Sequence, residues 1–321
     1  MTSRYQGIFT PLVTPITSDE SPDLASLRRL IDFQLENGVH GIWAMGTSAE
    51  FASFDEDQRA AAVQTSVEAV RSRVPVIANA SDASTRKAIR HARRAAEVGA
   101  DAVAVTPPYY YPHTQDELLA HYRAIRAEVD LPLYIYNIPQ TVRVRIELGT
   151  AQVLIAEGTV AGIKDSQNDL EWFRQLTLFA RQQNLPFVAF AGTRYLIDAA
   201  ILAGAQGAIP SLANAFPDVC VATYNAVAAG DLAASVDAEA TIIELESVAG
   251  LLSGGSRNAA ILGFLKAILH RRGVIESPAL TAPLRTPTAE EQQLLYDRVQ
   301  ELLAASDQAA SAARLASTTK R

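Results

Sequence analysis

Short apolar segments alternate with longer amphipathic segments over the first two thirds of the chain. The apolar segments are rich in Val, Ile and Ala and are bounded by Gly, Pro and polar residues, a pattern typical of buried strands. Apolar residues at successive positions, rather than at alternate ones, predict strands that are covered on both faces, as in parallel sheets. The eight expected strands are Gly7–Ile16, Gly41–Gly46, Pro75–Ala80, Asp101–Pro107, Leu131–Asn137, Val160–Ser166, Phe187–Gly192 and Gly207–Ser211.

The segments between these strands have the spacing of helices. Pro22–Asn37 places leucines at helical intervals and is followed by Gly38, a common residue after a helix C-terminus. Thr114–Val129 begins with a residue suited to N-capping and carries acidic residues in its first turn. Eight strands, each followed by a helix, favour a closed (β/α)8 barrel, with an open doubly wound sheet as the alternative. No G-x-G-x-x-G motif follows the first strand, which weakens that alternative.

The last third of the chain is predicted to be helical. We expect the barrel to occupy residues 1–230, followed by a three-helix extension over residues 231–304 that packs on the barrel or on a partner subunit. Residues 305–321 are rich in Ala and Ser and are expected to form a disordered tail. The extension contains the expected helices Leu232–Leu252, Asn258–Arg272 and Ala289–Ala304.

Composition and charge exclude several classes of function. The chain has 321 residues and a formal net charge of −7, which argues against nucleic acid and anionic membrane as partners. Its histidines form no short metal-binding spacing and Cys220 is the only cysteine, so neither structural zinc nor a disulfide framework is expected. The N-terminus lacks the apolar core of a signal peptide, and no apolar run is long enough to span a membrane, which predicts a cytoplasmic protein.

The lysine in Val160–Ser166 is the first candidate for chemistry. Only four of the 28 basic residues are lysines, and Lys164 lies inside an apolar strand. A lysine can lose its proton and act as an amine nucleophile, whereas a guanidinium stays charged. The structural alternative is a lysine whose ammonium group reaches solvent at the end of the strand.

The carboxyl ends of other strands supply hydroxyl and phenol groups, and in a barrel the loops after the strands converge on the active site. A desolvated lysine there has a lowered pKa and attacks a ketone to form an imine, an electron sink for breaking or making the adjacent carbon–carbon bond. Phenols and hydroxyls in a hydrogen-bonded chain can move the required protons. Taken singly, each tyrosine is equally well explained as a packing residue and the G-T-S segment as a turn. The strand ends read G-T-S-A-E (46–50), T-P-P-Y-Y-Y (106–111), Y-I-Y-N-I-P (134–139), K-D-S (164–166) and A-G-T (191–193).

These motifs resemble the N-acetylneuraminate lyase and dihydrodipicolinate synthase superfamily of class I aldolases, whose signatures are G-T-T-G-E, P-Y-Y, Y-N-x-P and G-x-K. Four motifs occur in the same order and on corresponding strands, and the resemblance covers roughly residues 7–304. It implies an enzyme that forms a covalent imine with pyruvate or a related 2-oxo acid and acts on an aldehyde partner. It implies no metal and no cofactor other than that imine.

Residue by residue, the resemblance makes Lys164 the Schiff-base lysine and Tyr136 the tyrosine that transfers protons at the imine and at the aldol oxygen. Thr47 and Ser48 match the threonine pair that relays protons and binds the carboxylate of the 2-oxo acid through backbone amides. Tyr110 matches the tyrosine that reaches into the site of a neighbouring subunit, which implies a homodimer or a homotetramer. Two further positions, which line the pyruvate pocket in the superfamily, correspond to Gly192 and Ile209.

The chain departs from dihydrodipicolinate synthases after its Y-N-x-P motif. Those enzymes have Ser-Arg there, and the arginine binds the carboxylate of aspartate semialdehyde, whereas this chain has Gln140 and Thr141. Because the uncharged Thr141 cannot form that bidentate contact, we reject lysine biosynthesis as the main function. Arg143 replaces a usual glycine, and it or Arg145 is a candidate to bind an acidic aldehyde, with a solvated arginine pair as the alternative.

Two other departures bear on regulation and backbone shape. Glu56 and Lys87 stand where a histidine and a glutamate are usual in synthases that lysine inhibits, so we expect no such inhibition. Ala49 replaces the glycine of G-T-T-G-E, so its φ is expected to avoid the left-handed region.

The resemblance implies a Schiff-base aldolase that forms or cleaves a 2-oxo-3-deoxy acid to pyruvate plus an aldehyde. A sugar acid such as 2-keto-3-deoxygluconate is the leading substrate, ahead of sialic acid, 4-hydroxy-2-oxoglutarate and aromatic hydratase-aldolase substrates. A dehydratase acting through the same imine, a dihydrodipicolinate synthase-like condensation and a non-catalytic 2-oxo acid sensor are the alternatives. The identity of the aldehyde is expected to depend on loops around Thr141, Arg143, Thr193 and His113.

Overall fold

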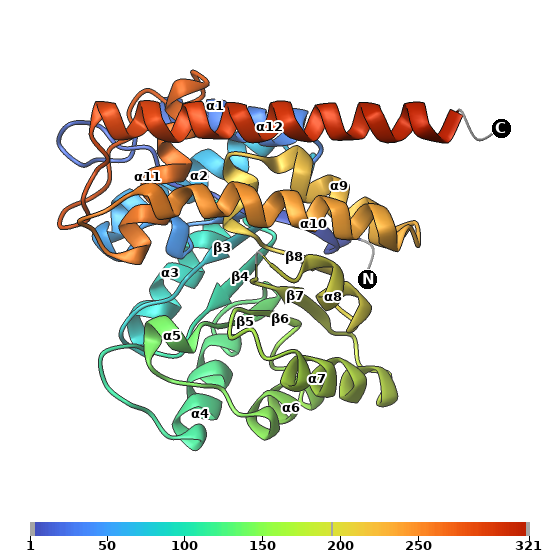
Figure 1. Ribbon diagram of the computed structural model, residues 1–321. Helices are drawn as coiled ribbons and strands as arrows, with labels where there is room; N and C mark the ends of the chain where they lie inside the picture. The colour runs from blue at the N-terminus through green and yellow to red at the C-terminus, as the bar shows by residue number, and fades with distance from the viewer. Residues whose placement is uncertain (1–3, 194, 319–321) are drawn as a thin grey trace.

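The computed structural model describes residues 4–193 and 195–318, with side chains up to residue 305. Eight parallel strands follow chain order around a closed barrel, and β8 pairs with β1 to close it (Figure 1). This confirms the (β/α)8 prediction and excludes the open sheet. The strands are β1 (Gly7–Pro11), β2 (Gly41–Ala44), β3 (Val76–Asn79), β4 (Ala102–Val105), β5 (Leu133–Asn137), β6 (Gly162–Asp165), β7 (Val188–Ala191) and β8 (Gly207–Ala208).

Helices surround this barrel and cover its outer face, and the strand residues are buried on both faces, as their continuous apolar sequence predicts. Every strand is shorter than its expected segment, and in all but β5 the ladder ends before the expected carboxyl end, so that the last residues belong to the loops at that end of the barrel. The helices are α1 (Leu24–Glu36), α2 (Glu56–Val70), α3 (Thr85–Glu97), α4 (Gln115–Arg126), α5 (Pro139–Val142), α6 (Leu148–Ala156), α7 (Leu170–Gln182), α8 (Ile197–Leu202) and α9 (Pro217–Ala228).

Local sequence explains the shape of two segments that follow strands, the start of α4 and the turn after β2. Thr114 caps α4 as expected: its side chain accepts a hydrogen bond from the N–H of Glu117, whose side chain accepts one from the N–H of Thr114. After β2 the chain forms two short 3₁₀ turns, η2 (Thr47–Ala49) and η3 (Phe51–Ser53). Glu50 between them has a φ of 58°, so the left-handed residue of the turn is this glutamate and not Ala49.

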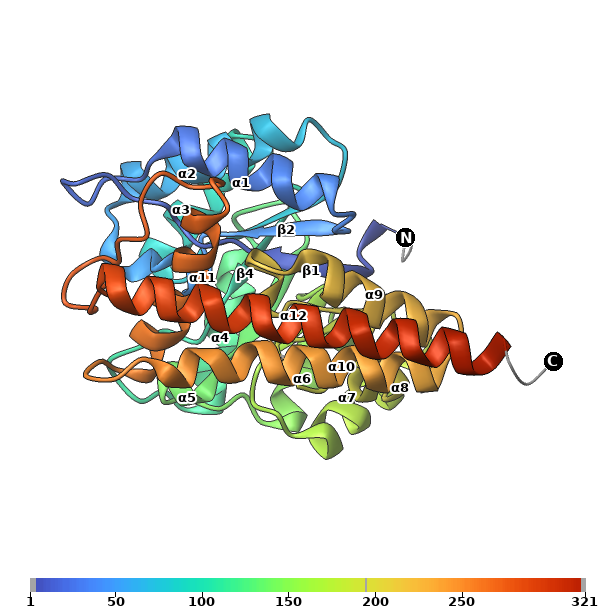
Figure 2. The same ribbon diagram turned by 45° about the horizontal axis from the view of Figure 1, so that its top comes forward.

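The C-terminal extension contains α10 (Leu232–Ser247), α11 (Arg257–Arg271) and α12 (Ala289–Thr318). Helices α10 and α12 lie side by side, and the end of α12 extends beyond the barrel (Figures 1 and 2). Residues 305–318 continue α12, although we expected a disordered tail from residue 305; their alanine-rich sequence has high helix propensity. The remaining part of that expected tail, residues 319–321, lies outside the described residues.

The extension packs on the barrel of its own chain. Phe264 of α11 stacks on Phe216, which precedes α9, with ring centroids 6.2 Å apart and an interplanar angle of 22°. Both rings are buried, so this contact joins the extension to the barrel core. No helix within residues 4–193 and 195–318 combines the length and apolar character needed to cross a membrane.

Candidate active site

Lys164 lies on β6 with its side chain inside the barrel, and only 4% of the residue is exposed. Burial lowers the pKa of its amine from 10.5 to about 7, because a charged amine is poorly stabilised away from water. The solvated ammonium, which was the structural alternative, is therefore excluded. A large fraction of the amine is unprotonated near neutral pH.

Tyr136 and Thr47 form a hydrogen-bonded chain with this amine. Tyr136 lies opposite Lys164 on the neighbouring strand β5, and its hydroxyl accepts a hydrogen bond from Lys164 Nζ at 3.4 Å. The same hydroxyl lies 3.0 Å from Thr47 Oγ1, and either oxygen can donate. Burial raises the pKa of Tyr136 to about 12, although its hydrogen bond with Thr47 opposes the rise. The phenol is therefore protonated at neutral pH and placed to pass protons between the amine and the threonine hydroxyl.

Trp43 on β2 forms the wall beside the amine. Lys164 Nζ lies 4.9 Å from the centroid of the Trp43 ring and 4.4 Å from that of Tyr136, positions that suit a cationic nitrogen. A Cβ at Gly46 would lie 2.8 Å from the Trp43 ring, so glycine lets the following turn pack closely against it. The sequence analysis did not select Trp43, because a tryptophan in an apolar strand carries no signal that separates it from a core residue.

A second buried ionisable group lies next to the lysine, at the end of β6. Asn137 Nδ2 donates a hydrogen bond to Asp165 Oδ1 at 2.6 Å, and burial raises the pKa of the Asp165 carboxyl to about 7. The Asp165 carbonyl accepts a hydrogen bond from the N–H of Gly192 at 2.6 Å. A Cβ at Gly192 would lie 2.0 Å from Ser166 Oγ, so only glycine fits this close approach of the two strand ends.

A cavity of about 1120 Å³ opens over these groups at the carboxyl ends of the strands. Because the strands are parallel, the loops that follow them meet at this end of the barrel. The cavity brings together the nine residues to which the family resemblance or the departures from it gave a catalytic or substrate-binding role, whereas Arg145 and His113 lie outside its lining. The nine are Thr47, Ser48, Tyr110, Tyr136, Thr141, Arg143, Lys164, Gly192 and Ile209.

The outer part of the cavity carries the positions at which the chain departs from the superfamily signatures. Thr141 lies in α5 and Arg143 follows that helix with a φ of 62°, and both are exposed. Arg145 instead forms an ion pair with Asp169 at 2.8 Å, outside the cavity lining. Arg257, at the start of α11, also lines the cavity. The sequence analysis missed Arg257, because no local pattern connects the C-terminal extension to the mouth of the barrel.

Tyr110 lies at the cavity mouth and is 86% exposed. Its φ of 89° is unfavourable for a bulky side chain, and its ring packs edge to face on Tyr111 with centroids 5.0 Å apart.

Thr193 lines the cavity, as expected for a specificity residue. The loop that precedes His113 lines the cavity through Pro112, whereas His113 itself does not, and its Nδ1 lies 3.7 Å from Glu117 Oε2.

Charged residues elsewhere on the barrel are engaged in ion pairs. Glu56 pairs with Arg90 at 3.2 Å and Lys87 with Asp82 at 3.6 Å, between neighbouring helices and loops. Among the described residues, no cluster of three or more His, Cys, Asp or Glu side chains is placed to hold a metal ion. The described cavity presents an amine, phenols and hydroxyl groups from Lys164, Tyr136 and Thr47 among others.

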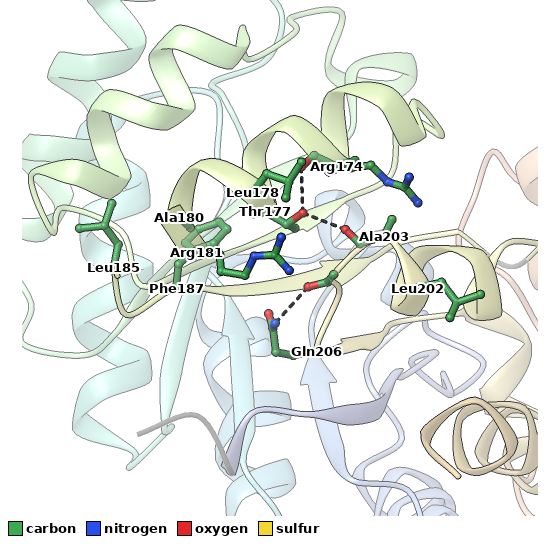
Figure 3. Close-up of a pocket in the computed structure, with 11 residues that line it drawn as sticks. Arg174, Thr177, Leu178, Ala180, Arg181, Leu185, Phe187, Leu202, Ala203 and Gln206 are labelled. Carbon is green, nitrogen blue, oxygen red and sulfur yellow. Dashed lines mark hydrogen bonds between the residues drawn. The ribbon is translucent and has the colours of Figure 1, made fainter. Parts of the chain in front are cut away.

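A second cavity, of about 540 Å³, lies between α7 and α8 near the amino ends of β7 and β8 (Figure 3). Its polar groups bind one another: Thr177 Oγ1 donates to the Ala203 carbonyl at 2.8 Å, and Gln206 Nε2 to the Gly204 carbonyl at 3.0 Å. It is lined by none of the nine candidate residues. The nine candidate residues lie at the opposite end of the barrel.

Comparison with known proteins gives one consistent result. Residues 4–302 match the dihydrodipicolinate synthetase family. An uncharacterized DapA-like lyase of Halobacterium salinarum is 34% identical over 279 residues, which are 87% of this chain and 88% of that protein. A 4-hydroxy-tetrahydrodipicolinate synthase of Nitrobacter hamburgensis is 30% identical over 271 residues, 84% of this chain and 90% of that protein. The crystal structure of dihydrodipicolinate synthase from Thermotoga maritima superposes with a TM-score of 0.84 and 29% identity, over 93% of this chain and 99% of that one.

Proposed function

Because the chain belongs to the dihydrodipicolinate synthetase family, we propose that it is a class I lyase that cleaves or forms a 2-oxo-3-deoxy acid through an imine on Lys164. The observation that supports this most directly is the buried chain from Lys164 Nζ through Tyr136 Oη to Thr47 Oγ1, at 3.4 and 3.0 Å. Binding of a 2-oxo acid by a sensor requires no such proton path. Catalysis is therefore favoured over a sensor role.

In the proposed reaction, the unprotonated Lys164 amine attacks the ketone carbon of the substrate to give a carbinolamine. Tyr136 supplies a proton to the departing hydroxyl, which leaves as water, and the iminium remains. The electron pair of the bond between C3 and C4 moves toward the iminium as Tyr136 accepts the proton of the C4 hydroxyl, so that the aldehyde leaves. The enamine is then protonated at C3, and water hydrolyses the imine to pyruvate and free Lys164. Synthesis follows the same steps in reverse.

The turn after β2 is proposed to hold the carboxylate of the 2-oxo acid. Thr47 and Ser48 begin the 3₁₀ turn η2, and the first N–H groups of a helical turn have no acceptor within it. Both residues line the cavity, together with Gly192 and Ile209 at its inner end. In this arrangement the ketone carbon of the bound acid faces Lys164.

We propose a sugar-derived acid such as 2-keto-3-deoxygluconate as the substrate. Uncharged Thr141 and Thr193 line the cavity. Their hydroxyl groups can form hydrogen bonds with the hydroxyl groups of a sugar-acid substrate. Thr141 stands at the position of the arginine in dihydrodipicolinate synthases, so this chain lacks the contact that the aspartate semialdehyde carboxylate needs there. Arg143 and Arg257 line the same region and are placed to bind a polar or acidic group of the aldehyde half.

A neighbouring subunit is proposed to complete the site. Tyr110 is 86% exposed and its backbone is held in the left-handed region at the cavity mouth. An exposed phenol in that position suits insertion into the site of a second copy, as the family resemblance implies. We therefore propose a homodimer or homotetramer in which Tyr110 is shared between sites.

Reductive trapping tests the imine. Pyruvate with borohydride is expected to add one pyruvate-derived mass to the peptide that contains Lys164, and the Lys164→Met protein serves as the control. A pyruvate-release screen over 2-oxo-3-deoxy acids, with a carbonyl trap for the aldehyde, then separates aldolase from dehydratase, because dehydration releases neither product. An unmodified Lys164 peptide would contradict the proposal.

The proposed role of Arg257 in binding the aldehyde half is tested with the substrate that the screen identifies as best. Loss of one charge-assisted hydrogen bond in Arg257→Gln is expected to raise KM about tenfold and to leave the trapping of pyruvate unchanged. The matched control is Arg145→Gln, since Arg145 binds Asp169 outside the cavity. Equal KM values in the two variants would exclude Arg257 from substrate binding.

A further inference from the structure

A buried ion pair joins the catalytic turn to the C-terminal extension. Lys266 of α11 places Nζ 2.6 Å from Glu50 Oε1, and the two side chains are 0% and 1% exposed. Glu50 is the residue that ends the G-T-S-A-E motif, directly after η2. The nucleophile and its proton path do not include this pair, so the proposed chemistry leaves its presence unexplained.

The extension supplies three hydrogen bonds to the Glu50 carboxylate. Oε1 accepts the bond from Lys266, while Oε2 accepts from the N–H of Thr281 at 2.7 Å and from Thr281 Oγ1 at 2.8 Å. Lys266 Nζ also donates to the Ala279 carbonyl at 2.8 Å. Thr281 Oγ1 also lies 3.0 Å from Ser53 Oγ, so the turn η3 contacts the same residue of the extension. The segment between α11 and α12 and the turn after β2 therefore form one polar cluster.

Such a cluster is a costly way to stabilise a fold. Taking two charges out of water consumes most of what their attraction returns, and apolar residues of similar volume are often as stabilising. A buried pair is better suited to specifying one conformation among several. The conformation at issue here is the left-handed backbone of Glu50, with a φ of 58° and a ψ of 31°, which is unfavourable for a residue with a side chain.

The backbone of Glu50 is in direct contact with the catalytic threonine. The N–H of Glu50 donates to the Thr47 carbonyl at 3.1 Å, and the Glu50 carbonyl accepts from the N–H of Ser53 at 2.9 Å. Thr47 in turn bonds Tyr136, which bonds Lys164. Displacement of Glu50 therefore moves the hydroxyl that ends the proton path and the N–H groups proposed to bind the carboxylate.

We propose that Lys266 and Thr281 are positioning residues, through which the C-terminal extension holds Glu50 and thereby sets the place of Thr47 and Ser48 in the active site. This inference rests on the proposed imine chemistry. It gives the extension a part in substrate binding and proton transfer, in addition to packing. Neither Lys266 nor Thr281 lines the cavity, whereas Glu50 does, so both residues act through their contacts with Glu50.

The test compares Lys266→Met with the double variant Glu50→Gln, Lys266→Met. The single variant leaves a buried carboxylate without its cation, whereas the double variant removes both charges and is expected to recover stability. Positioning predicts that kcat/KM for pyruvate release stays low in both, roughly 100-fold below the wild type, since a small misplacement of catalytic groups is enough for such a loss. It also predicts a raised KM for the 2-oxo acid and slower borohydride trapping on Lys164.

Two controls separate positioning from general loss of stability. Leu245→Ala removes a fully buried side chain of α10 in the same extension and is expected to lower stability with unchanged kcat and KM. Thr281→Val keeps the ion pair and the side-chain shape but loses one bond to Glu50, and about a tenfold fall in kcat/KM is expected even if Lys266→Met does not fold. Wild-type kinetics in the folded double variant, or in Thr281→Val, would overturn the inference. Absence of trapping in the wild type would instead overturn the proposed function itself.

Discussion

Lys164 and Lys266 are both buried lysines, yet their surroundings give them opposite properties. Lys164 lies against the rings of Trp43 and Tyr136, and burial alone lowers its pKa to about 7. Lys266 faces the Glu50 carboxylate at 2.6 Å, and although burial lowers its pKa as well, the carboxylate opposes that effect. Burial therefore makes a lysine reactive only where no anion accompanies it. An accompanying anion favours the charged form of the same side chain and holds its amine in place.

Replacing each lysine by methionine should distinguish the two roles, and the largest effect on activity is expected at Lys164. Lys164→Met removes the nucleophile, and pyruvate release is expected to fall by on the order of 10⁴-fold or more. Met has a similar volume and needs no hydration, so the urea midpoint should match or exceed that of the wild type. Release at more than a hundredth of the wild-type rate would show that the imine is not on this residue.

Tyr136→Phe tests the phenol that bonds Lys164. Loss of the proton donor and acceptor is expected to lower kcat by roughly 10²- to 10⁴-fold. Tyr122→Phe is the matched control, because that buried phenol donates to the Val105 carbonyl outside the cavity lining. Equal turnover in the two variants would exclude Tyr136 from proton transfer.

Lys266→Met is expected to lower stability in addition to activity, whereas Lys164→Met lowers activity alone. It leaves the Glu50 carboxylate buried without its cation, which should lower the free energy of unfolding by about 3–5 kcal/mol. Urea denaturation followed by circular dichroism measures this loss, and the added Glu50→Gln change should reverse most of it. A Lys266→Met protein as stable as the wild type would contradict the contrast between the two lysines.

The smallest effect concerns pH. Because the Lys164 pKa is about 7, the rate of imine trapping at low pyruvate concentration should level off above pH 7 and fall about tenfold per unit below it. Asp165 also has a pKa near 7, so the profile is repeated with Asp165→Asn, in which the fall should persist. A rate that keeps rising to pH 10 would mean that the amine behaves as an exposed lysine.

Sequence alone indicated the candidates for the inner half of the proposed site. A lysine inside an apolar run indicated Lys164, and the family resemblance added Tyr136 and Thr47, which the structure places in one hydrogen-bonded chain with it. The Glu50–Lys266 pair joins residues 216 positions apart, and nothing near either residue indicates the other. Arg257 was missed for the same reason, since a helix of the extension carries it to the barrel mouth. The continuation of α12 shows that an alanine-rich end was better judged by helix propensity than by its position in the chain.

The close approach at Gly192 has a consequence for how new specificities arise in this scaffold. A Cβ there would lie 2.0 Å from Ser166 Oγ, so any larger residue at position 192 would require Ser166 to shift at the inner end of the cavity. Thr141, Arg143 and Arg257 are exposed on the opposite side of the cavity, where replacements cost little folding free energy. Under the proposed function, a change of aldehyde specificity is expected from single replacements at these three positions, which makes them the first choice for saturation libraries.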